Sequence, residues 1–105
     1  MLRKIISEQG HNIIVVIQEQ VKRLEGTLQA GETLMVDCDA GKEQIRVQTF
    51  TFPNWHLAMV DGFDDSGNWT CGIENVQDIK LTFKVVKSPE KAPAIGFVLP
   101  PEKKK

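Results

Sequence analysis

The feature that most constrains how this chain can fold is a change in its hydrophobic period near residue 31. Across residues 12–25 the apolar side chains fall within one arc of a helical wheel, and most polar side chains occupy the other side. From residue 33 onward, apolar and polar residues alternate instead. A period near 3.6 residues is typical of an amphipathic helix, and a period of 2 is typical of a half-buried strand. The sequence therefore predicts an N-terminal helix followed by a series of strands.

The ends of the predicted helix leave alternatives open. Asn12 is suited to cap its N-terminus, and Gly26 is suited to the left-handed position after its last turn. The apolar arc also continues back to residue 2, and a helix that starts there would include Gly10 at a cost of about 1 kcal/mol relative to alanine. The five β-branched residues 13–17 would equally suit a buried strand, but the wheel pattern favours a helix.

Six segments after residue 31 have the alternation of short strands: 33–38, 44–52, 57–63, 69–73, 79–85 and 95–99. Turn-forming residues at 39–42 and 64–68 predict two hairpin loops. Within 44–52 the apolar positions change parity near Thr49, which predicts a β-bulge or a change of strand partner. Either Ile45 and Val47 or Phe50 and Phe52 would then face away from the main core. The helix or another chain would have to cover that pair.

These elements predict an α+β fold with an N-terminal helix and a curved antiparallel sheet or small barrel of five to six strands, SH3-like or Sm-like in size. A helix on an open antiparallel sheet is the main alternative. The 105 residues fit one domain over 1–101, with a disordered basic tail at 102–105. The lack of a long apolar run predicts a cytoplasmic protein with no membrane segment.

Residue types that carry chemistry are present but poorly spaced. Cys38 and Cys71 lie far from each other and from both histidines, so no zinc-binding pattern occurs. Strand parity places both thiols among apolar neighbours, which predicts that they are buried. Asp37 and Asp39 share the other face and are predicted to form a solvated rim. With no phosphate-binding loop or nucleophile–base pair, we predict no metal, no cofactor and no enzymatic activity.

Residues 62–71, Gly-Phe-Asp-Asp-Ser-Gly-Asn-Trp-Thr-Cys, carry a local resemblance to a known family. The Gly, the Asp two residues later and the Asn four residues further on resemble the first Sm motif of Sm-like RNA-binding proteins. The resemblance covers ten residues and implies that Asp64 and Asn68 help to bind a base. Gly67 replaces the usual hydrophobic residue, the upstream strands are longer, and no second motif follows.

The leading functional prediction is a small non-catalytic binding or accessory module for protein–protein interaction or self-association. Its contact surface is predicted around five residues: Trp55, His56, Asp64, Asn68 and Trp69. The alternative is a small RNA- or DNA-binding barrel that uses Asp64, Asn68, Lys80 and Lys84, although the charge balance does not favour nucleic acid. A third hypothesis is a small-molecule pocket lined by Trp69, Phe83 and Phe97.

Overall fold

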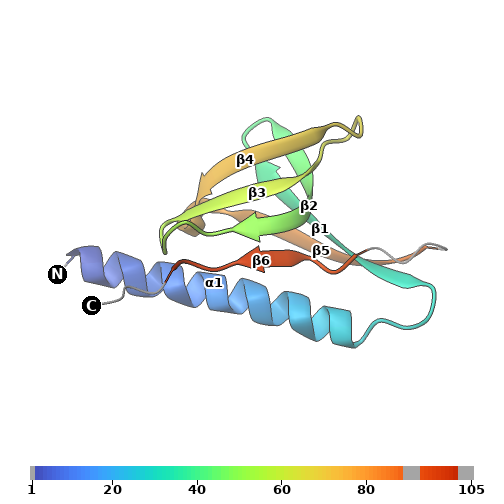
Figure 1. The fold of residues 1–105 in the computed structure, drawn as a ribbon, viewed down its shortest axis with the longest axis horizontal. Helices are drawn as coiled ribbons and strands as arrows, with labels where there is room; N and C mark the ends of the chain where they lie inside the picture. Colours follow the sequence, from blue (N-terminus) through green and yellow to red (C-terminus); the bar gives the residue numbers. More distant parts are fainter. Residues whose placement is uncertain (1, 89–92, 102–105) are drawn as a thin grey trace.

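Helix α1 spans Leu2–Gly26 and precedes all the strands (Figure 1). The computed structural model describes residues 2–88 and 93–101, with side chains from residue 9 onward, so the predicted tail at 102–105 lies outside the described residues. The helix is confirmed, but it begins near residue 2, and Asn12 lies inside it rather than at its cap. The left-handed conformation predicted for Gly26 is wrong, because the positive-φ glycines are Gly31, Gly41 and Gly67. The N–H and hydroxyl of Thr27 both donate to the Leu24 carbonyl where the helix ends.

The strands form one curved, open sheet with the order β4-β3-β2-β1-β5, and β6 pairs in parallel with β2. Neighbouring strands on the main path are antiparallel, which confirms the predicted fold class. The elements after α1 are β1 (Glu32–Ala40), β2 (Glu43–Thr51), β3 (Leu57–Phe63), β4 (Trp69–Asn75), the 3-10 helix η1 (Val76–Asp78), β5 (Lys80–Lys87) and β6 (Gly96–Val98).

The parity change in β2 is a β-bulge. The register between β2 and β3 shifts between Val47 and Thr49, as the sequence predicts. The expectation that one apolar pair faces away from the core is wrong, because all four side chains on either side of the shift are buried: Ile45, Val47, Phe50 and Phe52. The extra residue turns both pairs to the same face of the sheet. None of these four side chains is therefore left exposed for another chain to cover.

Strands β1 and β2 separate beyond their hairpin. Their pairing covers residues 37–40 of β1 and 43–46 of β2, after which β1 continues beside β5 alone. The second half of β2 pairs with β3 on one side and with β6 on the other. Figure 1 shows β6 running between α1 and the rest of the sheet. At the point of separation, Asp37 is buried beside Arg46 (Oδ1 to Nε 3.6 Å), so the prediction of a solvated Asp37 is wrong.

Helix α1 packs one apolar stripe, with Ile14, Ile17 and Val21 buried, into the core. Gly10 continues this stripe and lies directly against the backbone of Trp55. A Cβ on Gly10 would overlap the Trp55 carbonyl oxygen, so the glycine permits the close approach of the helix. Of the helices in the described ranges, none is both long and apolar enough to cross a membrane.

Candidate functional site

The five predicted surface residues do not form one surface. Trp55 and His56 precede β3, whereas Asp64, Asn68 and Trp69 follow it. Because β3 has seven residues and each adds about 3.3 Å, the two groups lie roughly 20 Å apart. The structure thus brings Asp64, Asn68 and Trp69 together and places Trp55 and His56 at the opposite end of the strand.

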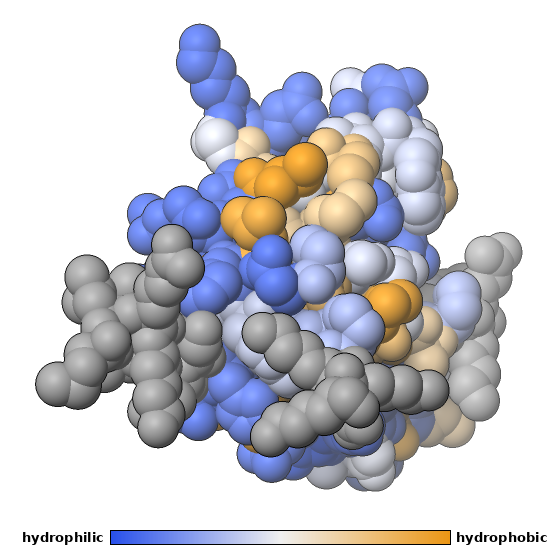
Figure 2. Space-filling model, turned by 60° about the vertical axis from the view of Figure 1, so that its left-hand side comes forward, coloured by the Kyte–Doolittle hydropathy of each residue, from blue (hydrophilic) through white to orange (hydrophobic). Residues whose placement is uncertain are grey.

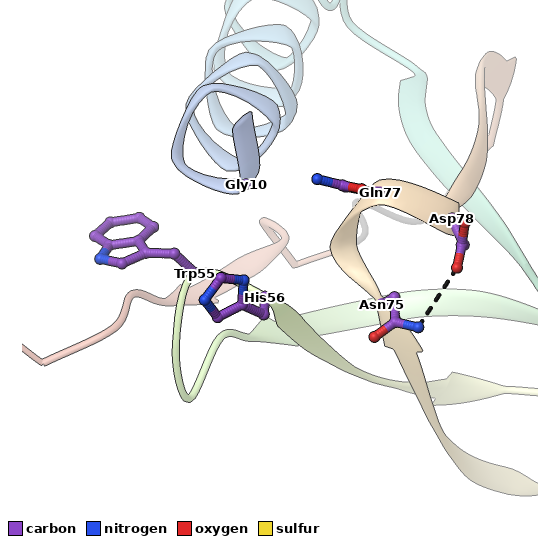
Figure 3. Close-up of a pocket in the computed structure, with 6 residues that line it drawn as sticks. All are labelled: Gly10, Trp55, His56, Asn75, Gln77 and Asp78. Carbon is purple, nitrogen blue, oxygen red and sulfur yellow. Dashed lines mark hydrogen bonds between the residues drawn. The ribbon is translucent and has the colours of Figure 1, made fainter. Parts of the chain in front are cut away.

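Trp55 and His56 line a hollow of 210 Å³ between α1, the turn before β3, and η1. In Figure 3, Gly10 lies above these two side chains, and Asn75, Gln77 and Asp78 stand across from them. The Trp55 indole is half-buried and meets the His11 ring edge-on at a centroid distance of 4.6 Å. Trp55 therefore packs partly as a core residue between helix and sheet.

Hydrogen bonds hold this end of β3 in place. The Asn54 side-chain oxygen accepts from the backbone N–H groups of His56 and Leu57, and the Val76 N–H donates to the His56 carbonyl at 2.8 Å. The Gln77 amide donates to Gln9 of α1 at 2.9 Å. Through these hydrogen bonds, polar groups around the hollow connect η1 to the turn before β3 and to α1.

The hairpin loop at the other end of β3 is built around Asp64. One oxygen of its carboxylate accepts from the backbone N–H groups of Ser66 and Asn68, both at 2.9 Å, and the other lies 3.5 Å from the Asn68 amide nitrogen. These hydrogen bonds, with that from the Asn68 backbone the strongest, lower the pKa of Asp64. Gly67 supplies the positive φ that the turn requires. The carboxylate that the Sm-like resemblance assigns to a base is here engaged in the loop itself.

Trp69 leads a row of exposed side chains on the outer face of β4. Trp69 is 59% exposed and Ile73 is 65% exposed, and their register partners on β3 are Phe63 and Met59. The Trp69 and Phe63 rings meet edge-on at 5.1 Å. Figure 2 shows strongly hydrophobic atoms grouped at the height at which Figure 1 places β3 and β4, with hydrophilic residues around them. We call the outward-facing side chains of β4 and their register partners on β3 the β4 face. It consists of Trp69, Cys71 and Ile73 with Phe63, Asp61 and Met59.

The sequence predicted that Cys71 is buried among apolar neighbours, and that prediction is wrong, because Cys71 is exposed together with Trp69 and Ile73. At Gly72 the inner face of the sheet leaves little room for a side chain. A Cβ on Gly72 would lie 3.0 Å from the Cβ of Ala40, so a small residue must point inward and its large neighbours outward. The third hypothesis also fails, because Trp69 is exposed whereas Phe83 and Phe97 pack against the core.

The two thiols differ in environment. Cys38 is buried, as predicted, and burial, with the nearby charges of Glu74 and Asp39, raises the pKa of its thiol to about 11. Cys71 is exposed, and its register partner on β3 is Asp61. The hydrogen bond from the Cys71 thiol to the Asp61 carboxylate is the main cause of its raised pKa. The β4 face therefore presents one accessible thiol beside one carboxylate.

We expect a bulky maleimide dye to label Cys71 and not Cys38 in the native chain at mildly alkaline pH. Asp61→Asn should speed this labelling, because removing the carboxylate lowers the pKa of Cys71 and raises its thiolate fraction at any pH below that pKa. The rate is measured by mass spectrometry across a pH series. The control is Asp65→Asn, an exposed carboxylate in the nearby loop. Labelling that persists in Cys71→Ser, or equal rates in both aspartate variants, would contradict these assignments.

Comparison with known proteins adds no functional assignment: no family model, curated protein or solved structure matches the chain. Within the described ranges, no three His, Cys, Asp or Glu side chains come together in a way that could hold a metal ion. The sequence signal for the β4 face was weak, because residues 57–63 carry apolar side chains on both faces. Alternation separates two faces, but it does not say which one the rest of the chain covers.

Proposed function

We propose that this protein is a non-catalytic interaction module that self-associates through the β4 face. The observation that carries the proposal is the exposure of three large side chains, Phe63, Trp69 and Ile73, on one side of the sheet. Isolated exposed apolar residues are ordinary on a protein surface, but a contiguous group bordered by polar residues is typical of an interaction site. Tryptophan is also among the residues that most often dominate the binding energy of such sites.

The position of β4 supports strand-to-strand contact. β4 and β5 are the two end strands of the sheet on its main path, so each has one edge without a neighbouring strand on that path. Exposed edges pair readily with an added strand unless charge or shape prevents it. An added strand beside β4 would extend the sheet and continue the β4 face onto the second molecule.

Charge complementarity favours β5 of a second copy as that strand. Residues 51–79 contain five acidic residues and no lysine or arginine, whereas β5 contains three lysines and no acid. Val85, on β5, is also 43% exposed. β4 itself carries one acid, Glu74, so two copies of β4 would bring two carboxylates together, whereas β4 against β5 brings Glu74 near lysines. Such a contact joins two different surfaces of the same chain and leads to a ring or a filament.

Analytical ultracentrifugation of the full chain tests this proposal. We expect the wild type to sediment above the mass of one chain, 11.8 kDa, as its concentration rises to high micromolar. Ile73→Ser should weaken association severalfold, because its side chain would lose its contact with the strand added beside β4, and such cross-strand pairs contribute roughly 0.2–1 kcal/mol. The matched control is Val16→Ser on α1, where the exposed side chain is 62% accessible but lies outside the β4 face.

Two results would overturn the proposal. The first is a wild-type chain that stays monomeric at high micromolar concentration, which would show that it does not self-associate. Equal weakening by Ile73→Ser and Val16→Ser would show that association does not depend on the β4 face. Far-ultraviolet circular dichroism of both variants checks that the fold is unchanged.

A further inference from the structure

A second hollow, of 340 Å³, opens where β1 and β2 separate. Three consecutive residues of each strand line it: residues 33–35 of β1 and residues 46–48 of β2. Because consecutive residues of a strand point to opposite faces, this lining places the hollow between the strand edges rather than over one face of the sheet. The end of β5, Ser88, Pro93 and Ile95 are the other described residues that line it.

The inner part of this hollow is apolar. Leu34 and Val47 belong to the buried core, and Ile95 is half-buried and packs against that core. Met35 and Val86, both half-buried, extend the apolar lining. A ligand that enters between β1 and β2 would therefore meet the hydrophobic core directly. Sites of this kind bind small molecules largely through their apolar surface, and a few polar groups fix the orientation.

The described charged side chains that line the hollow are all basic. Arg46 and Lys87 line it, and none of the described lining residues is acidic. Three carboxylates lie near these residues without lining the hollow, and one of them, Glu32, is the register partner of Lys87. Asp37 pairs with Arg46, Glu32 accepts from the Gln29 N–H at 2.8 Å, and Glu25 accepts from the Ile95 N–H at 3.1 Å. Within the described part of the chain, no carboxylate lies within ion-pair distance of Lys87, so its ammonium group can contact an anion at the rim of the hollow in addition to facing Glu32 across the strands.

We propose that this hollow binds a small amphipathic carboxylate. Its apolar chain lies between β1 and β2 against Leu34 and Val47, and its carboxylate lies beside Lys87 at the rim. The volume provides room for about ten non-hydrogen atoms, taking the volume of one water molecule for each. A medium-chain fatty acid such as octanoate has this size and charge. None of the residues of the β4 face lines this hollow, but Lys87 lies on β5, the strand that the proposed function pairs with β4 of a second copy.

Titration of the full chain with octanoate, followed by two-dimensional ¹H–¹⁵N NMR, tests the proposal. We expect saturable shifts centred on Leu34, Val47 and Ile95. Octanol, which lacks the charge, should bind more weakly than octanoate, and octylammonium, which has the opposite charge, should bind most weakly. Lys87→Gln should raise the Kd for octanoate about fivefold, the size expected for one exposed ion pair.

Lys84→Gln is the matched control, because it removes the same charge from the same strand at a position outside the hollow. It should leave the Kd for octanoate unchanged, and thermal unfolding should show that both variants remain folded. Four outcomes would overturn the proposal: no saturable binding of octanoate, equal binding of octylammonium, equal effects of the two lysine variants, or shifts centred on Trp69 and Ile73.

Discussion

Phe50→Ala is expected to lower the free energy of unfolding by about 3–5 kcal/mol, the usual cost of truncating a fully buried phenylalanine. The Phe50 ring has no solvent exposure and packs near-parallel to two others, Phe52 at 6.0 Å and Phe97 at 5.4 Å. Phe50 sits on β2, where β3 pairs on one side and β6 on the other. Three hydrogen-bonded strands cannot readily close over the missing ring, so a cavity should remain.

Urea unfolding followed by circular dichroism measures this loss. The control is Phe63→Ala, which removes the same atoms from the 40% exposed ring on the β4 face. Its cost should be far smaller, about 0.5–1.5 kcal/mol for the lost contact with Trp69. Equal losses in the two variants would contradict the assignment of Phe50 to the core and of Phe63 to the outer face.

The elements that the sequence predicted correctly are those that local patterns determine. The helix follows from a periodic arc of apolar residues, and the turns follow from glycines that take positive φ, Gly41 and Gly67. The bulge near Thr49 was visible because apolar residues changed parity within one strand. Each of these signals lies within a few residues along the chain, so no knowledge of distant contacts was needed.

The β4 face and the separation of β1 from β2 depend on contacts between distant residues. Trp69 and Ile73 point outward on a strand whose Gly72 closely approaches Ala40, which lies 32 positions earlier in the chain. Likewise, β6 pairs in parallel with the part of β2 that β1 has left, and nothing in residues 95–99 alone indicates this partner. Of the five predicted site residues, the structure groups Trp69 with Asp64 and Asn68 but places Trp55 and His56 at the far end of β3.

At Gly10, helix propensity and tertiary packing predict opposite changes in the free energy of unfolding when the residue is replaced by alanine. Helix propensity alone predicts that Gly10→Ala stabilises the chain by about 1 kcal/mol. In the folded structure, however, the new methyl group would overlap the Trp55 carbonyl, which is backbone and cannot rotate away. We therefore expect a net loss of about 3 kcal/mol, because overpacking of this kind displaces the helix from the sheet.

Urea unfolding of Gly10→Ala and Gly26→Ala separates the two effects. Gly26 ends the same helix and has open space where a Cβ would point, so its substitution should be neutral or slightly stabilising. In a Trp69→Phe background, the fluorescence of Trp55 reports on the helix contact directly, and we expect a shift to longer wavelength in Gly10→Ala only. If both glycine variants are stabilised and Trp55 fluorescence is unchanged, α1 does not rest on the turn before β3.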